Sequence, residues 1–155
     1  MQARLDYAKT APDAYAAVVA LNDYVVRQSG LDLRLIDLIK LRASQINGCA
    51  YCVNLHSKEA RQHGATEQWI NLVSAWQESP VFSAAERAVL GWTEALTRLA
   101  ETRAPDADYA ALVPFFSPAE IVRITTAIGL INVWNRLAVG FRSQHPIDHP
   151  KAAAV

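Results

Sequence analysis

Two cysteines and a histidine stand close together in the chain, at a spacing that suits thiol chemistry. The stretch NGCAYCVNLHSKEARQHG, residues 47–64, contains Cys49, Cys52 and His56, and the chain has no other cysteine. On an α-helix, at about 100° per residue, Cys52 lies about 60° from Cys49 and His56 about 40° from Cys52. The three side chains therefore share one face, where the two sulfur atoms can form a disulfide and the imidazole can exchange a proton with Cys52.

The expected position of Cys49 in the first turn of this helix favours a reactive thiolate. Unpaired backbone N–H groups and the helix dipole stabilise negative charge there. Two other interpretations stay open: a pair of thiols buried in the core, or a zinc site in which Asp37 joins the cysteines and His56. We favour a redox dithiol, which needs no metal and no other cofactor.

The preceding segment, residues 31–46, is predicted to form a helix antiparallel to residues 49–63. At about 1.5 Å per residue, Asp37 and His56 lie at similar distances from the Asn47-Gly48 turn. A carboxylate beside an imidazole fixes its tautomer and raises its basicity. The sequence thus predicts a proton relay from Asp37 through His56 to Cys52. The alternative is that Asp37 is a solvated charge on the surface of its helix.

The elements that hold these residues are predicted to be helices throughout a single domain, residues 1–155. Apolar residues recur at helical spacing, and no stretch keeps the alternation of a strand. Caps and turns divide the chain into a bundle of about six or seven helices. The main boundaries are Pro12, Gly30, Asp32, Asn47-Gly48, Gly64, Thr66, the capping boxes Ser83–Glu86 and Ser117–Glu120, and an end near Phe141.

The composition excludes several classes of protein. Lys plus Arg and Asp plus Glu number 15 each, so no global charge favours nucleic acid or an anionic membrane. The N-terminal residues lack the apolar run of a secretory signal. The most apolar stretch, AIGLINVWNRLAVGF, is interrupted by polar residues and is too short to span a membrane. We therefore predict a cytoplasmic protein, where thiols are kept reduced.

The same apolar stretch predicts burial of the last helix on more than one side. Such a helix in a short chain suggests contact with a second copy of the protein. Asn132 and Asn135 are expected to form hydrogen bonds across helices or at that interface. His63, beside Gly64, is predicted to cap the end of its helix.

The run LIKLRASQINGCAYCVNLHSKEARQHG, residues 38–64, resembles the core of the alkylhydroperoxidase D-like proteins in the carboxymuconolactone decarboxylase superfamily. The resemblance implies an all-helical fold that assembles into trimers or hexamers. It also implies that Cys52 attacks the peroxide, that Cys49 resolves the product to a disulfide, and that His56 and Asp37 relay protons. The chain has Asp37 where the peroxidase pattern has Glu, and Tyr51 where some members have His.

The predicted function is therefore a thiol-dependent peroxidase of the alkylhydroperoxidase type. Its expected partners are a small organic hydroperoxide, a thiol or dithiol reductant, and further copies of the chain. Two alternatives remain: a lyase-like relative that does not need the cysteines, and a non-enzymatic helical assembly that senses redox state.

Overall fold

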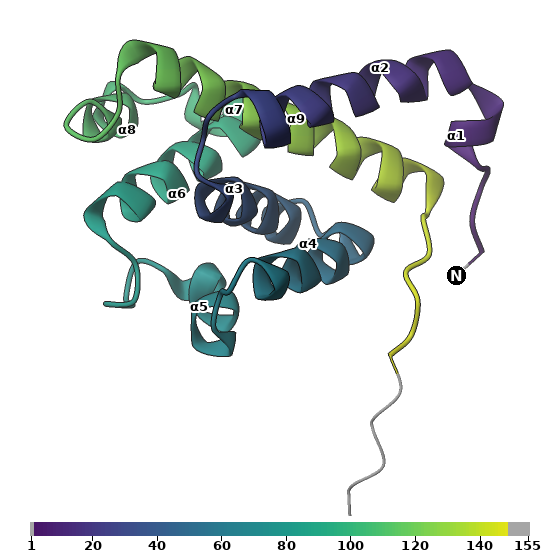
Figure 1. Ribbon diagram of the computed structural model, residues 1–155, viewed down its shortest axis with the longest axis horizontal. Helices are drawn as coiled ribbons and strands as arrows, with labels where there is room; N and C mark the ends of the chain where they lie inside the picture. The colour runs from purple at the N-terminus through teal and green to yellow at the C-terminus, as the bar shows by residue number, and fades with distance from the viewer. Residues whose placement is uncertain (1, 149–155) are drawn as a thin grey trace, which may run out of the picture.

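The computed structural model describes residues 2–148, and within them nearly every regular element is an α-helix and none is a strand (Figure 1). The α-helices are α1 (Tyr7–Thr10), α2 (Pro12–Asp23), α3 (Leu33–Ile46), α4 (Ala50–Gln62), α5 (Glu67–Leu72), α6 (Ala84–Thr97), α7 (Leu99–Thr102), α8 (Asp106–Leu112) and α9 (Pro118–Phe141). A π-helical turn, Tyr24–Gln28, extends α2, and a 3₁₀ turn, Val73–Ala75, extends α5. The predicted all-α class is confirmed.

The described residues contain more helices than the six or seven predicted, because two of the nine are single turns. α1 and α7 have four residues each, which is too short for a helical period to show in the sequence. The longer helices begin where their caps predict. Ser83 and Ser117 each form both hydrogen bonds of a capping box, at the starts of α6 and α9.

α3 lies at the centre of the molecule and packs against α4, α6 and α9 (Figure 1). One side of α3 places Ile36 and Ile39 in an apolar cluster with residues of α6 and α9. Another side places Leu38 and Leu41 in a second cluster with residues of α5 and α6. The buried polar residues of α3, namely Asp37, Lys40 and Ser44, belong to neither cluster and are described below.

The short connection between α3 and α4 is held by side-chain amides. Asn47 donates to Oδ1 of Asn132 at 3.0 Å and to Oδ1 of Asn135 at 2.8 Å. Asn135 in turn donates to Oγ of Ser44 at 3.0 Å, and the Cys49 N–H donates to the Ser44 carbonyl at 3.0 Å. These bonds confirm the prediction that Asn132 and Asn135 connect helices, and they fix the start of α4 against α9.

α9 is apolar on nearly all sides, as predicted, and part of that surface is exposed. Val122, Val133 and Val139 are exposed, while Ile124, Ile128 and Ile131 on the same helix are buried. Contact with a second copy remains a prediction. Among the described residues, no helix combines the length and the apolar character needed to cross a bilayer.

Glu86 connects three elements through one buried carboxylate. The residue is only 7 % exposed. It accepts hydrogen bonds from Nε of Arg34 at 2.7 Å and from the Trp69 indole at 3.1 Å. It also accepts from the Ser83 N–H at 2.8 Å, within the capping box. Burial alone would raise the pKa of Glu86, but these hydrogen bonds and the charge of Arg34 outweigh it and hold the pKa below its ordinary value.

We expect Glu86→Ala to lower the free energy of unfolding by about 2 to 4 kcal/mol at pH 7, because it leaves buried donors unpaired. The native pKa is depressed, so the stabilisation is complete above the unfolded pKa of about 4.3 and is lost as pH falls through the native value. Urea denaturation of both proteins should therefore show a difference that shrinks in acid. Glu101→Ala, at an exposed site, is the control; equal losses in the two variants would contradict the assignment.

Candidate active site

The two cysteines lie together at the start of α4, as predicted. Cys49 is the N-cap residue, and its sulfur accepts a hydrogen bond from the Cys52 N–H at 3.3 Å. The two residues form a disulfide, and their Cα atoms are 5.3 Å apart, within the usual range for such a bond. Both are nearly inaccessible, with exposed fractions of 1 % for Cys49 and 3 % for Cys52.

A cavity of about 430 Å³ lies beside Cys52, in the size range of small-molecule sites. Helices α1, α2, α3, α4 and α9 all contribute to its walls. Cys52 is among the lining residues and Cys49 is not. Much of the wall is aromatic or aliphatic, from residues that include Tyr7, Tyr15, Val19, Val26, Tyr51, Leu55 and Trp134; the ionisable lining residues other than the tyrosines are Asp37, Lys40, His56, Glu59 and His63.

His56 lines this cavity one turn after Cys52 and is bonded to a carboxylate of its own helix. Its Nδ1 lies 2.8 Å from Oε2 of Glu59. Burial alone would raise the pKa of Glu59, but the hydrogen bond and charge of His56, with the nearby charges of Lys40 and His63, hold the pKa below its ordinary value. Glu59 is therefore ionised near neutral pH and accepts the bond. Nδ1 then carries the proton, and Nε2 is left for proton exchange in the cavity.

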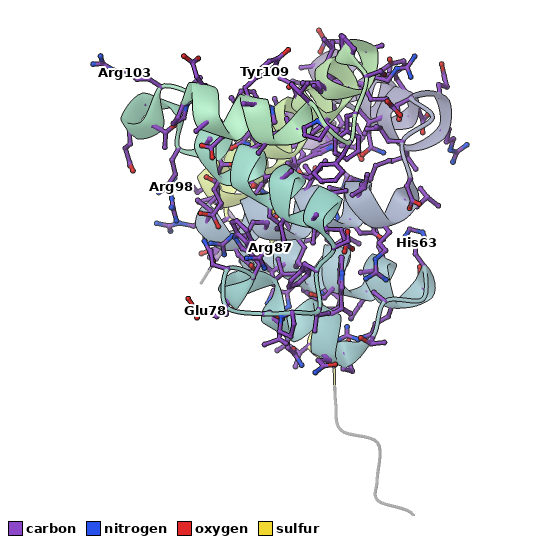
Figure 2. The ribbon with its side chains drawn as sticks, turned by 90° about the vertical axis from the view of Figure 1, so that its left-hand side faces the viewer. His63, Glu78, Arg87, Arg98, Arg103 and Tyr109 are labelled. Carbon is purple, nitrogen blue, oxygen red and sulfur yellow. A yellow bond between two sulfur atoms is a disulfide. The ribbon has the colours of Figure 1, made fainter. Side chains whose placement is uncertain are left out.

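The predicted contact between Asp37 and His56 is wrong: Asp37 contacts a different histidine. Oδ2 of Asp37 lies 2.7 Å from Nδ1 of His63. His63, labelled in Figure 2, is the residue that follows the last turn of α4. The physical reason is the direction of the side chains, which lean toward the N-terminus of their own helix. On α3 this direction leads away from the turn, and on α4 it leads toward the turn. Asp37 therefore reaches a residue farther along α4 than a count of Cα positions indicates.

Lys40, which was not among the predicted site residues, completes the charged part of the cavity. Lys40 is 5 % exposed and stands on the same side of α3 as Asp37. Burial lowers the pKa of Lys40, while the negative charges of Glu59 and Asp37 oppose this shift. Burial also raises the pKa of Asp37, by more than the hydrogen bond and charge of His63 lower it.

The sequence spacing of some of these residues could have indicated their place in the site. Glu59 follows His56 by three positions, which places both on one side of α4. Lys40 falls between Asp37 and Ser44 at helical spacing. His63 does end α4, as predicted, but its ring also pairs with Asp37. Within residues 2–148, no group of three or more His, Cys, Asp or Glu side chains is arranged to hold a metal ion.

The sequence matches the model of the carboxymuconolactone decarboxylase family over residues 12–95. The chain is 34 % identical over 139 residues to YdfG of Bacillus subtilis, an uncharacterized protein, with 90 % of this chain and 94 % of that protein aligned. The chain therefore belongs to the carboxymuconolactone decarboxylase family, and its dithiol, fold and structural relatives make it an alkylhydroperoxidase D-like member.

Two solved structures illustrate the range of these relatives. A protein of unknown function from Agrobacterium tumefaciens, linked by name to the antioxidant defence protein AhpD, is 59 % identical with a TM-score of 0.92. That alignment covers 95 % of this chain and all of the other. The debrominase Bmp8 is 22 % identical with a TM-score of 0.77, over 88 % of this chain and 73 % of its own, and so shares the fold.

Proposed function

We propose that the protein is a thiol-dependent peroxidase that reduces organic hydroperoxides at Cys52. The observation that carries the proposal is the placement of one sulfur of a disulfide-forming pair on a cavity that also contains an imidazole. Cys49 lies behind Cys52, within bonding distance but away from the cavity. This arrangement supports Cys52 as the sulfur that meets the substrate and Cys49 as the sulfur that resolves the product.

In the first step, the Cys52 thiolate attacks the terminal oxygen of the hydroperoxide. The S–O bond forms as the O–O bond breaks, and the sulfur is oxidised while the peroxide is reduced. The alkoxide leaves with the electron pair of the O–O bond and takes a proton. His56 is the proposed carrier of this proton: its Nε2, which is free because Glu59 holds Nδ1, takes the proton of the Cys52 thiol and passes it to the alkoxide. The products are an alcohol and a sulfenic acid on Cys52.

In the second step, the Cys49 thiolate attacks the sulfur of the sulfenic acid. The S–S bond forms, the S–O bond breaks, and hydroxide leaves to become water. Two equivalents of a thiol, or one of a dithiol, then reduce the disulfide by exchange. The balance is one hydroperoxide and two thiols converted to one alcohol, one water and one disulfide.

The relatives of this chain support redox chemistry in general. The relative from Agrobacterium tumefaciens is linked by name to antioxidant defence, and it shares 59 % of its residues with this chain. We also propose that the protein works in the cytoplasm, where thiol reductants are present, and that several copies of the chain assemble.

The test is the loss of free thiol in the reduced protein after addition of an alkyl hydroperoxide. We expect two thiols to disappear for each hydroperoxide consumed, and continued consumption once a dithiol reductant is present. Both thiols remaining titratable in excess hydroperoxide would overturn the proposal. Oxidation without turnover under any thiol reductant would instead favour a redox-sensing assembly. Turnover of a lactone acid by a variant without cysteines would favour a lyase.

A further inference from the structure

We propose that the cavity selects hydroperoxides that carry a carboxylate, and that Lys40 binds this carboxylate. The inference rests on the proposed function, because it names the class of hydroperoxide that this site would take. It is carried by a lysine whose side chain lines the cavity and whose ammonium pairs with none of the described residues.

Lys40 is 5 % exposed, and its ammonium forms no hydrogen bond and no ion pair with any residue among 2–148. The described residues contain no fully buried side-chain nitrogen or oxygen without a hydrogen-bond partner, so the Nζ atom of Lys40 is accessible from the cavity although the rest of the side chain is buried. Burial lowers the pKa of Lys40, and the negative charges of Glu59 and Asp37 oppose this shift. The N–H groups of the Lys40 ammonium therefore have no acceptor among the described residues and are available to a ligand in the cavity.

The two neighbouring carboxylates are already engaged by imidazoles. Asp37 lies 2.7 Å from His63, and Glu59 lies 2.8 Å from His56. Neither approaches Lys40 closely enough to form an ion pair. Each carboxylate therefore has a partner of its own, and Lys40 is the group that a ligand would have to satisfy.

The position of Lys40 on α3 indicates where such a ligand would lie. On the same side of α3, Ser44 contacts the start of α4 near Cys49, and Asp37 contacts its end at His63. Lys40 lies between these two levels, about one helical turn, or about 5 Å along the axis, from each. Asp37 and Glu59 would repel a second carboxylate, so we place the ligand on the Cys52 side of Lys40.

The rest of the wall suits an apolar body. Tyr7, Tyr15, Tyr51 and Trp134 line the cavity from four different helices. A ligand with its carboxylate at Lys40, its hydroperoxide at Cys52 and its alkyl part against these rings would use all three features. The chemistry thus points to acids in which only a few bonds separate the carboxylate from the O–O group.

The experiment compares a tertiary alkyl hydroperoxide that bears a terminal carboxylate with its methyl ester. We expect the wild type to show a kcat/KM about 10 to 100 times higher for the acid, the range of one charged hydrogen bond. Lys40→Met and Lys40→Gln should remove this preference, so that the ratio of kcat/KM for the acid to kcat/KM for the ester falls to about one, whatever loss the ester itself shows. Lys58→Met is the matched control, because Lys58 pairs with Asp148 and does not line the cavity.

Equal kcat/KM for acid and ester in the wild type would overturn the proposal. So would an equal loss for both substrates in the Lys40 variants, which would mean that Lys40 only balances the charge of Asp37 and Glu59. Calorimetric binding of the product hydroxy acid and its ester to the disulfide form gives a readout that needs no turnover. If the wild type binds the acid and not the ester, and Lys40→Gln loses this binding, the carboxylate site is supported. If neither hydroperoxide is reduced, the proposed peroxidase activity is overturned, but this binding result still stands.

Discussion

Cys52→Ser is expected to abolish hydroperoxide reduction, by at least about a thousandfold in kcat/KM, whereas Cys49→Ser is expected to allow a single turnover. The thiolate is the nucleophile, and a serine hydroxyl at the same place is not appreciably ionised near neutral pH. Loss of a nucleophile typically costs several orders of magnitude. Cys49→Ser keeps the sulfur that lines the cavity and loses only the sulfur that closes the disulfide.

Stopped-flow consumption of an alkyl hydroperoxide and mass spectrometry of the treated protein measure both variants. Reduced Cys49→Ser should gain one oxygen atom on Cys52 and react with a sulfenic acid trap, while Cys52→Ser should stay unmodified at Cys49. The two variants serve as controls for each other, since each removes the same disulfide. A reactive Cys52→Ser beside an inert Cys49→Ser would reverse the assigned roles.

Most of the framework around the dithiol was predictable because it depends on local interactions. Asp32, Thr66, Ser83 and Ser117 each accept a hydrogen bond from the first turn that follows, and these bonds involve residues close in sequence. The face shared by Cys49, Cys52 and His56 follows from helical geometry alone. Such features need no knowledge of how one helix packs on another.

The pairing of charges was less predictable, because it depends on which way side chains lean between two packed helices. Asp37 and His56 stand at similar heights by a count of residues, yet each has another partner. Asp37 reaches His63, and His56 bonds Glu59 of its own helix. The resemblance placed an acid at position 37 but could not show that the shorter Asp side chain is bonded to a different ring.

Lys40 illustrates a second limit of the sequence. A lysine in an amphipathic helix is ordinarily exposed, so its type and spacing predict a solvated charge. Burial of Lys40 follows from the apolar clusters on the other sides of α3, which draw that helix into the centre of the molecule. A feature that arises from packing on several sides at once cannot be read from one segment.

The relay provides the final prediction: Glu59→Gln should lower kcat/KM for an alkyl hydroperoxide by about 10 to 100 times, and His56→Gln by about 100 times or more. General acid–base groups contribute about 10² to 10⁴, and a group that orients them contributes less. Asp37→Asn removes a charge from the same cavity but not from His56, so its effect should stay within about threefold.

The Glu59 and Asp37 variants form a matched pair, because both replace a carboxylate by its amide near Lys40. The pKa values of Glu59 and Asp37 are shifted in opposite directions, so the two variants should affect the stability of the protein differently. The pKa of Glu59 is lowered in the fold, so its ionised form stabilises the protein above the unfolded pKa of about 4.3, and Glu59→Gln should cost some stability at pH 7. The pKa of Asp37 is raised in the fold, so ionisation of Asp37 lowers the stability of the protein as pH rises. Asp37→Asn should therefore not lower the stability at pH 7.

The pH dependence of kcat/KM distinguishes a positioning role for Glu59 from a purely structural one. Because Glu59 is hydrogen-bonded to His56 and Asp37 is not, Glu59→Gln should change the shape of this pH profile, whereas Asp37→Asn should leave the shape unchanged. Denaturation curves identify any variant that is partly unfolded under the assay conditions. A change in the pH profile of kcat/KM in Asp37→Asn and not in Glu59→Gln would show that Asp37 takes part in the proton relay. It would also show that the contact of Glu59 with His56 is not used in the reaction.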